Sequence, residues 1–115
     1  MRIVFDLDGT LDQPALARLF VELYACHGVE LTVLTGGRSR EATQEVARRK
    51  LARMGLPVDV DVVVACGPGP RTVAKEKAKW LAKNRVSLFI DDSDLYCAEA
   101  LRAAPSTTVL HVRAE

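Results

Sequence analysis

The stretch MRIVFDLDGTLD, at Met1–Asp12, decides the fold of this chain. Its short apolar run, Ile3–Phe5, is typical of a strand that is buried on both faces. Because side chains two residues apart on an extended segment point the same way, we expect Asp6 and Asp8 to project together. Gly9 then allows the backbone to turn sharply. A polar strand end followed by an ordinary turn is the plainer interpretation of the same residues.

Two carboxylates that leave one strand end together repel each other unless a cation or a shared proton relieves them. Hard oxygen ligands of this kind suit Mg²⁺. The pair Asp6 and Asp8 therefore predicts a magnesium site at the end of the first strand.

Apolar runs alternate with amphipathic segments along the rest of the chain. The patterns predict strands at 2–6, 31–34, 61–65, 86–90 and 107–111, and helices at 13–27, 39–54, 71–84 and 94–103. Such alternation is typical of an α/β fold, with a parallel sheet covered by helices on both faces. Ligands of such sheets bind beyond the carboxyl ends of the strands, where the polar motifs of this chain also fall.

Two more predicted strands end in polar motifs. The second runs into Thr35–Arg38, where a hydroxyl and two glycines before a helix form a natural cradle for phosphate, although an ordinary turn has the same residues. The fourth runs into Asp91 and Asp92, and two further carboxylates there would be costly without a cation nearby. A helix cap with a solvated neighbour is the alternative for this acidic pair.

The helix predicted at 71–84 is rich in lysine, with Lys75, Lys77, Lys79 and Lys83. A helix this basic cannot point every lysine inward, so most of them are expected on the solvated surface.

Together the motifs fall in a fixed order. Asp-x-Asp follows the first strand, Thr35 the second, a lysine lies on the helix before the fourth, and Asp91-Asp92 follows the fourth. This order resembles the haloacid dehalogenase superfamily of phosphatases and phosphotransferases, over Phe5–Ser93. The resemblance implies a Rossmann-like three-layer α/β/α sandwich, with a five-stranded parallel sheet of order 5-4-1-2-3, as one domain over residues 1–115.

The resemblance also implies roles for individual residues. Asp6 would be the nucleophile that forms an aspartyl-phosphate, and Asp8 the general acid and base. Thr35 and Gly36 would bind the phosphoryl oxygens. Lys77 is our choice for the phosphate-binding lysine of the family.

Lys75 is the alternative to Lys77, because a difference of two residues places them on different helix faces. Mg²⁺ would be held by Asp6, by Asp8 through its backbone carbonyl, and by Asp92. Asp91 would hold the lysine or a metal-bound water.

No segment of the chain has room for the cap domain that many members of this family carry. An open site excludes water poorly and does not select small substrates by enclosure. We therefore expect a macromolecular or partner-enclosed phosphorylated substrate, with a 5′ or 3′ phosphate of a nucleic acid as one candidate. Arg38 and Arg40 are candidates for remote contacts with such a polyanion.

Composition adds only broad limits. The 115 residues are 49% hydrophobic and carry a net charge of +1, which gives no strong push toward nucleic acid or a membrane. The three cysteines, Cys26, Cys66 and Cys97, lack the spacing of a disulfide framework or a zinc site, which favours a reducing cytoplasm. We expect no secretory signal and no membrane-spanning stretch.

Two other classes of protein compete with a magnesium-dependent phosphatase. A phospho-receiver signalling domain has a similar length and alternation, but it needs an aspartate after the third strand, where this chain has Ala65–Gly67. A protein that keeps the fold only for binding or as a scaffold remains an alternative, although every expected catalytic residue type is present.

Overall fold

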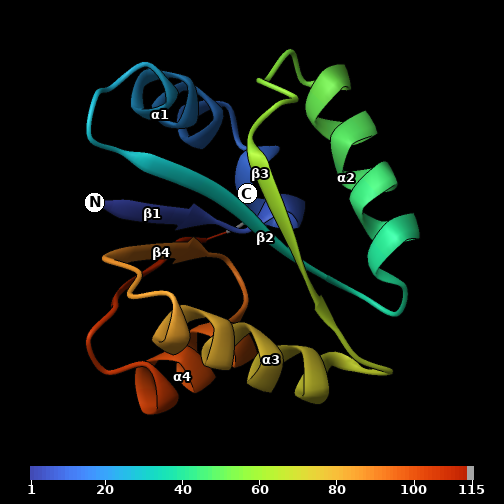
Figure 1. Ribbon diagram of the computed structural model, residues 1–115, viewed down its shortest axis with the longest axis vertical. Coiled ribbons are helices and arrows are strands. Elements are labelled where there is room, and N and C mark those ends of the chain that lie inside the picture. The colour runs from blue at the N-terminus through green and yellow to red at the C-terminus, as the bar shows by residue number, and fades with distance from the viewer. Residues whose placement is uncertain (114–115) are drawn as a thin grey trace.

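The computed structural model describes residues 1–113 and shows a parallel five-stranded sheet between two layers of helices (Figure 1). The strands are β1 (Arg2–Phe5), β2 (Glu30–Gly37), β3 (Asp61–Cys66), β4 (Leu88–Asp91) and β5 (Thr108–His111). The helices are α1 (Pro14–Tyr24), α2 (Arg40–Arg53), α3 (Pro70–Lys83) and α4 (Asp94–Ala103). The sheet order β3-β2-β1-β4-β5 confirms the predicted order 5-4-1-2-3 and the α/β fold.

The two faces of the sheet carry separate apolar cores. On the face covered by α1 and α2, Phe5 packs edge-on against Phe20, with ring centroids 5.3 Å apart. On the face covered by α3 and α4, Val4, Leu34 and Phe89 of neighbouring strands are fully buried. Burial on both faces explains why β1 has a continuous apolar run instead of an alternating one.

Some predicted boundaries are wrong by a few residues. The first helix ends at Tyr24, before His27, and Gly28 follows in the left-handed region at φ +81°. The second strand extends to Gly37, because its pairing with β3 continues to Gly37 opposite Cys66. The fourth strand begins at Leu88 because the amide of Val86 is still bonded to the carbonyl of Leu81 in α3.

The strand register brings the polar motifs together at one edge of the sheet. Phe5 of β1 lies opposite Val33 of β2 on one side and Ile90 of β4 on the other. Just beyond β1, the amide of Asp6 donates to the carbonyl of Ile90 at 2.9 Å. The acidic pair Asp91 and Asp92 at the end of β4 and Thr35 near the end of β2 therefore flank Asp6.

The connections leave no room for an inserted domain within residues 1–113. A turn at 7–11 and α1 link β1 to β2, and α2 alone lies between β2 and β3. None of the helices in residues 1–113 combines the length and the apolar character that a membrane span needs.

Candidate functional site

A buried lysine lies at the centre of the acidic cluster. The side chain of Lys77, on α3, is 1% exposed, and its Nζ donates to Asp6 Oδ1 at 2.8 Å and to Asp91 Oδ2 at 3.3 Å. The same ammonium lies 4.2 Å from the centre of the Tyr96 ring, which is within the range of a cation–π interaction. Lys75, two residues earlier, is exposed, so the structure places Lys77 and not Lys75 among these carboxylates.

Burial shapes the protonation of this cluster. Burial raises the pKa of Asp6 to about 7; the Lys77 ammonium lowers it and the Asp91 carboxylate raises it. Burial alone would lower the pKa of Lys77, but the carboxylates of Asp6 and Asp91 outweigh it and raise the pKa. One ammonium therefore does not fully compensate the buried carboxylates, and further positive charge at this place is favourable.

Three carboxylates can converge on one metal ion. Asp6, Asp91 and Asp92 each offer an oxygen, and these oxygens lie within 4.8 Å of one another. The Thr10 hydroxyl lies 3.3 Å from both Asp6 Oδ2 and Asp92 Oδ1, and the amide of Ser93 donates to Asp91 Oδ1 at 3.0 Å. An all-oxygen set of this kind fits Mg²⁺.

Gly9 permits the close packing of the turn on this cluster. It adopts φ +80°, and a Cβ at this position would lie 2.1 Å from Asp92 Oδ2. Any other residue would strain the left-handed backbone and displace the nearby carboxylate. The motif after β1 is therefore in direct contact with the motif after β4.

The expectation that Asp6 and Asp8 project together is wrong for their side chains. Asp6 is buried, whereas the side chain of Asp8 is 69% exposed and its Oδ1 lies 2.7 Å from Nζ of Lys50 on α2. The physical reason is that β1 ends at Phe5 and the turn begins at Leu7, so the alternation of an extended strand stops before Asp8. The carboxylate of Asp8 does not belong to the acidic cluster.

A hollow of about 390 Å³ joins the turn after β1 to the predicted phosphate cradle. Asp8, Thr35 and Gly36 line it, together with Arg38 and Lys50. Thr35 is buried, with 5% of its surface exposed. The proposed acid and the cradle thus face the same space.

Gly36 also has a packing role. A Cβ there would lie 2.4 Å from Cγ1 of Val73 on α3. The absence of a side chain lets α3 approach the cradle closely. The same helix carries Lys77, so this contact helps to place the lysine beside β1.

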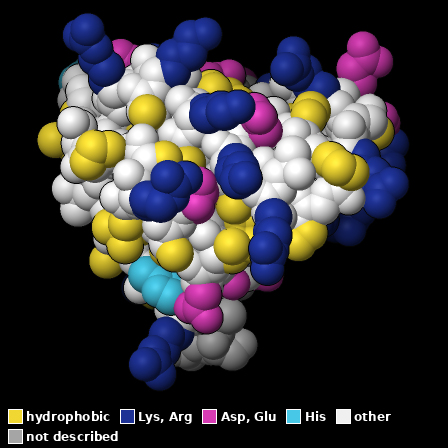
Figure 2. All heavy atoms as spheres, turned by 90° about the horizontal axis from the view of Figure 1, so that it is seen from below, with side chains coloured by type: hydrophobic (Ala, Val, Ile, Leu, Met, Phe, Trp, Pro, Cys, Tyr) yellow, Lys and Arg dark blue, Asp and Glu magenta, His cyan; other side chains and the backbone are white. Residues whose placement is uncertain are grey.

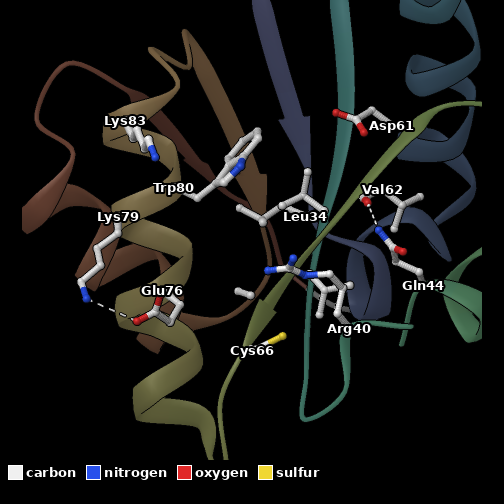
Figure 3. A pocket seen from close by; sticks show the side chains of 13 residues that line it. Leu34, Arg40, Gln44, Asp61, Val62, Cys66, Glu76, Lys79, Trp80 and Lys83 are labelled. Carbon is white, nitrogen blue, oxygen red and sulfur yellow. Dashed lines mark hydrogen bonds and ion pairs between the residues drawn. The ribbon is translucent and has the colours of Figure 1, made fainter. Parts of the chain in front are cut away.

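Arg40 does not line the hollow that contains Asp8. It lines a separate one of about 620 Å³, at the open edge of β3 between α2 and α3 (Figure 3). Trp80 and Lys83 of α3 lie on the opposite side of that second hollow, which includes none of the acidic cluster. Of the two arginines expected near the mouth, only Arg38 lies there.

The other lysines of α3 are on the surface, as predicted. Lys75, Lys79 and Lys83 are exposed. The face that carries α3 and α4 shows basic side chains spread over it, with acidic ones between several of them (Figure 2).

Two residues of the site, Thr10 and Tyr96, were not predicted from the sequence. Thr10 lies in the first motif, and its position after the turn glycine was the available signal, whereas Tyr96 had none because it reaches Lys77 from another helix. Lys50 was expected on a basic, solvated face of the second helix, and its contact with Asp8 was not predicted.

Two solved structures resemble this chain in fold. No protein-family model and no curated protein matches its sequence. A chain in a structure of the Pnkp1/Rnl/Hen1 RNA repair complex superposes with a TM-score of 0.74 at 19% identity; the match covers 97% of this chain but 42% of that one. A universal stress protein in complex with cAMP superposes with a TM-score of 0.60 at 15% identity, over 100% of this chain and 98% of that one. These similarities place the chain among Rossmann-like α/β folds.

Proposed function

We propose that this chain is a Mg²⁺-dependent phosphomonoester hydrolase of the haloacid dehalogenase type. The observation that carries the proposal is the buried Lys77, which contacts Asp6 and Asp91 beside a third carboxylate, that of Asp92. Groups with strongly perturbed pKa values that converge at the carboxyl ends of parallel strands are typical of a reaction centre.

In the proposed reaction, a carboxylate oxygen of Asp6 attacks the phosphorus atom and the ester P–O bond breaks. Asp8 donates a proton to the departing alkoxide, which leaves as an alcohol. Water then attacks the phosphorus of the aspartyl-phosphate while Asp8 accepts a proton from it, and inorganic phosphate leaves with the Asp6 carboxylate restored. The Lys77 ammonium neutralises negative charge on the phosphoryl oxygens, and the hydroxyl of Thr35 orients them by donating a hydrogen bond.

Asp6 and Asp92 would be direct ligands of the metal ion, together with the backbone carbonyl of Asp8, and Asp91 would hold it through water. Bound Mg²⁺ supplies positive charge that offsets the repulsion between a carboxylate nucleophile and a phosphate dianion. The raised pKa of Asp6 supports this need, because the nucleophile must be ionised to react and the buried site lacks sufficient positive charge.

The open mouth supports a substrate that brings its own binding surface. The side chain of Asp8 is largely exposed, and no inserted unit covers it within residues 1–113. Remote contacts are what position a reacting group in such a site. The similarity in fold to a chain of an RNA repair complex is compatible with a phosphorylated nucleic-acid end as this substrate.

The direct test is hydrolysis of an aryl phosphate by the purified protein, with Mg²⁺ or with EDTA. We expect activity with Mg²⁺ only, and acid-stable labelling of the wild type, but not of Asp6→Asn, by a phosphate-labelled substrate. Activity that persists in EDTA would contradict the metal assignment. Inactivity on a broad panel of phosphoesters would favour a scaffold, in which Lys77 serves only to join the strand ends.

A further inference from the structure

The exposed carboxylate of Asp8 is held by a residue with no assigned role. Nζ of Lys50 lies 2.7 Å from Asp8 Oδ1, and the two side chains are 38% and 69% exposed. Lys50 belongs to the last turn of α2, far from Asp8 in the sequence. While this ion pair is formed, one oxygen of the proposed acid and base is occupied by an ammonium instead of the substrate.

Lys50 also lines the hollow in front of the phosphate cradle. Arg38 lines the same space, and the apolar side chains of Val46 and Ala47 contribute to its wall. Val46 is 46% exposed and is one of the large apolar side chains on the surface. The hollow is thus lined by apolar side chains and by two cationic residues as well as by Thr35, and the Arg38 guanidinium also donates to the carbonyl of Pro68 at 3.2 Å. Such a lining suits a leaving group that carries negative charge of its own.

We propose that the preferred substrate carries a second phosphate group on its leaving group, and that this group takes Lys50 away from Asp8. This inference depends on the function proposed above. An exposed ion pair between an ammonium and a carboxylate contributes little stability, whereas phosphate offers more charge and more acceptor oxygens. Binding of such a substrate would therefore break the pair and release Asp8 to act on the ester oxygen.

The mechanism predicts opposite effects of one substitution on two substrates. In Lys50→Ala, Asp8 is free at all times but the second phosphate has lost its partner. We expect kcat/KM for adenosine 3′,5′-bisphosphate to fall by roughly tenfold to a hundredfold, the equivalent of one charge-assisted hydrogen bond. For adenosine 5′-monophosphate we expect a rise of at most about fivefold, the limit set by an exposed ion pair.

Two variants provide matched controls. Lys50→Arg keeps the charge and should keep the preference for the second phosphate. Arg53→Ala removes an equal charge one turn further along the chain, outside the hollow, and should leave kcat/KM unchanged for both substrates. A 5′-phosphorylated tetranucleotide is tested separately. If Lys50 raises kcat/KM over that of adenosine 5′-monophosphate for the tetranucleotide alone, the substrate is a nucleic-acid end. If Lys50 raises it for the bisphosphate alone, the substrate is a small molecule.

A decrease of equal factor on both substrates, or no change on either, would overturn the inference. Measurements of nucleotide binding distinguish failure of this inference from failure of the proposed function. In the Asp6→Asn protein, which cannot turn over, calorimetry should show tighter binding of the bisphosphate than of the monophosphate, and Lys50→Ala should remove the difference. Selective binding without hydrolysis by the wild type would refute the phosphatase but retain the second-phosphate site; equal binding would refute that site.

Discussion

Nζ of Lys77 lies 2.8 Å from Oδ1 of Asp6, and both side chains are buried. Replacement of Lys77 by methionine would leave Asp6 and Asp91 without their cation. Because removal of one partner from a buried ion pair leaves an uncompensated charge, we expect Lys77→Met to lower the free energy of unfolding by about 3 kcal/mol in the absence of metal. Urea denaturation at neutral pH in EDTA measures this change.

Lys75→Met is the matched control on the same helix. Lys75 is exposed, so its replacement should change stability by no more than about 0.5 kcal/mol. Asp6→Asn, added to Lys77→Met, should recover part of the loss because it removes one of the uncompensated carboxylates. Equal effects of the two lysine substitutions would show that the buried pair of Lys77 and Asp6 does not stabilise the folded protein.

The pH dependence of stability follows from Asp6. Burial raises the pKa of Asp6 in the folded protein to about 7, from 3.8 as its ordinary value. The folded state therefore binds the Asp6 proton more tightly than the unfolded state does. The contribution of this proton to the free energy of unfolding is complete in acid and is lost as pH rises through about 7. In EDTA, we expect the contribution of this group to fall by about 2 kcal/mol between pH 5 and pH 7.

Thermal unfolding of the wild type and of Asp6→Asn at several pH values isolates this contribution. The melting temperature of Asp6→Asn should vary less over that range, because asparagine does not titrate. If both proteins show the same pH profile, Asp6 is not the group responsible. Saturating Mg²⁺ should also flatten the profile of the wild type, since a bound cation favours the ionised carboxylate.

The sheet and its polar edge were predictable because they depend on local patterns. Ile3–Phe5 is apolar without alternation, as a strand covered on both faces requires, and the alternation of strands with helices determined the layers. The order of the strands came from the resemblance to a known family and agrees with the structure.

The direction of Asp8 was not predictable in the same way. It depends on where β1 stops, and one residue of difference in a strand end reverses the side to which a side chain points. Its partner Lys50 lies on another helix, and nothing in the spacing of the sequence signals that contact. The predicted position of Arg40 was also wrong. Arg38 lies before α2 and Arg40 begins it, and the two side chains line different hollows.

Asp8→Asn tests the acid role within the proposed function. An alkyl leaving group needs a proton to depart, whereas an aryl leaving group with a low pKa needs little help. We expect Asp8→Asn to lower kcat/KM, which reports the steps up to departure of the alcohol and not the later attack of water, by about 10²-fold or more for an alkyl phosphate and by much less for an aryl phosphate. Steady-state rates on both substrates measure the ratio, with Asp12→Asn, an exposed neighbour, as the control. Equal losses on both substrates would remove Asp8 from the role of acid.

Gly9→Ala tests whether the turn after β1 and the acidic pair after β4 form one metal site. The new Cβ would lie 2.1 Å from Asp92 Oδ2, so the carboxylate must move. Gly28→Ala is a closely matched control: Gly28 has φ +81°, against +80° for Gly9, but has no neighbouring atom within 4 Å of the added carbon. Both substitutions should cost on the order of 1 kcal/mol of stability through left-handed strain.

The two variants should differ in their affinity for Mg²⁺. Displacement of Asp92 should weaken binding by about tenfold or more in Gly9→Ala, because small shifts of a metal ligand and its supports have effects of this size. Gly28→Ala, with the same backbone strain and no contact, should bind Mg²⁺ like the wild type. Isothermal titration calorimetry on the folded proteins measures both affinities. If Gly9→Ala loses stability but retains its affinity for Mg²⁺, Asp92 does not bind the ion and the metal site must be reassigned to the remaining carboxylates.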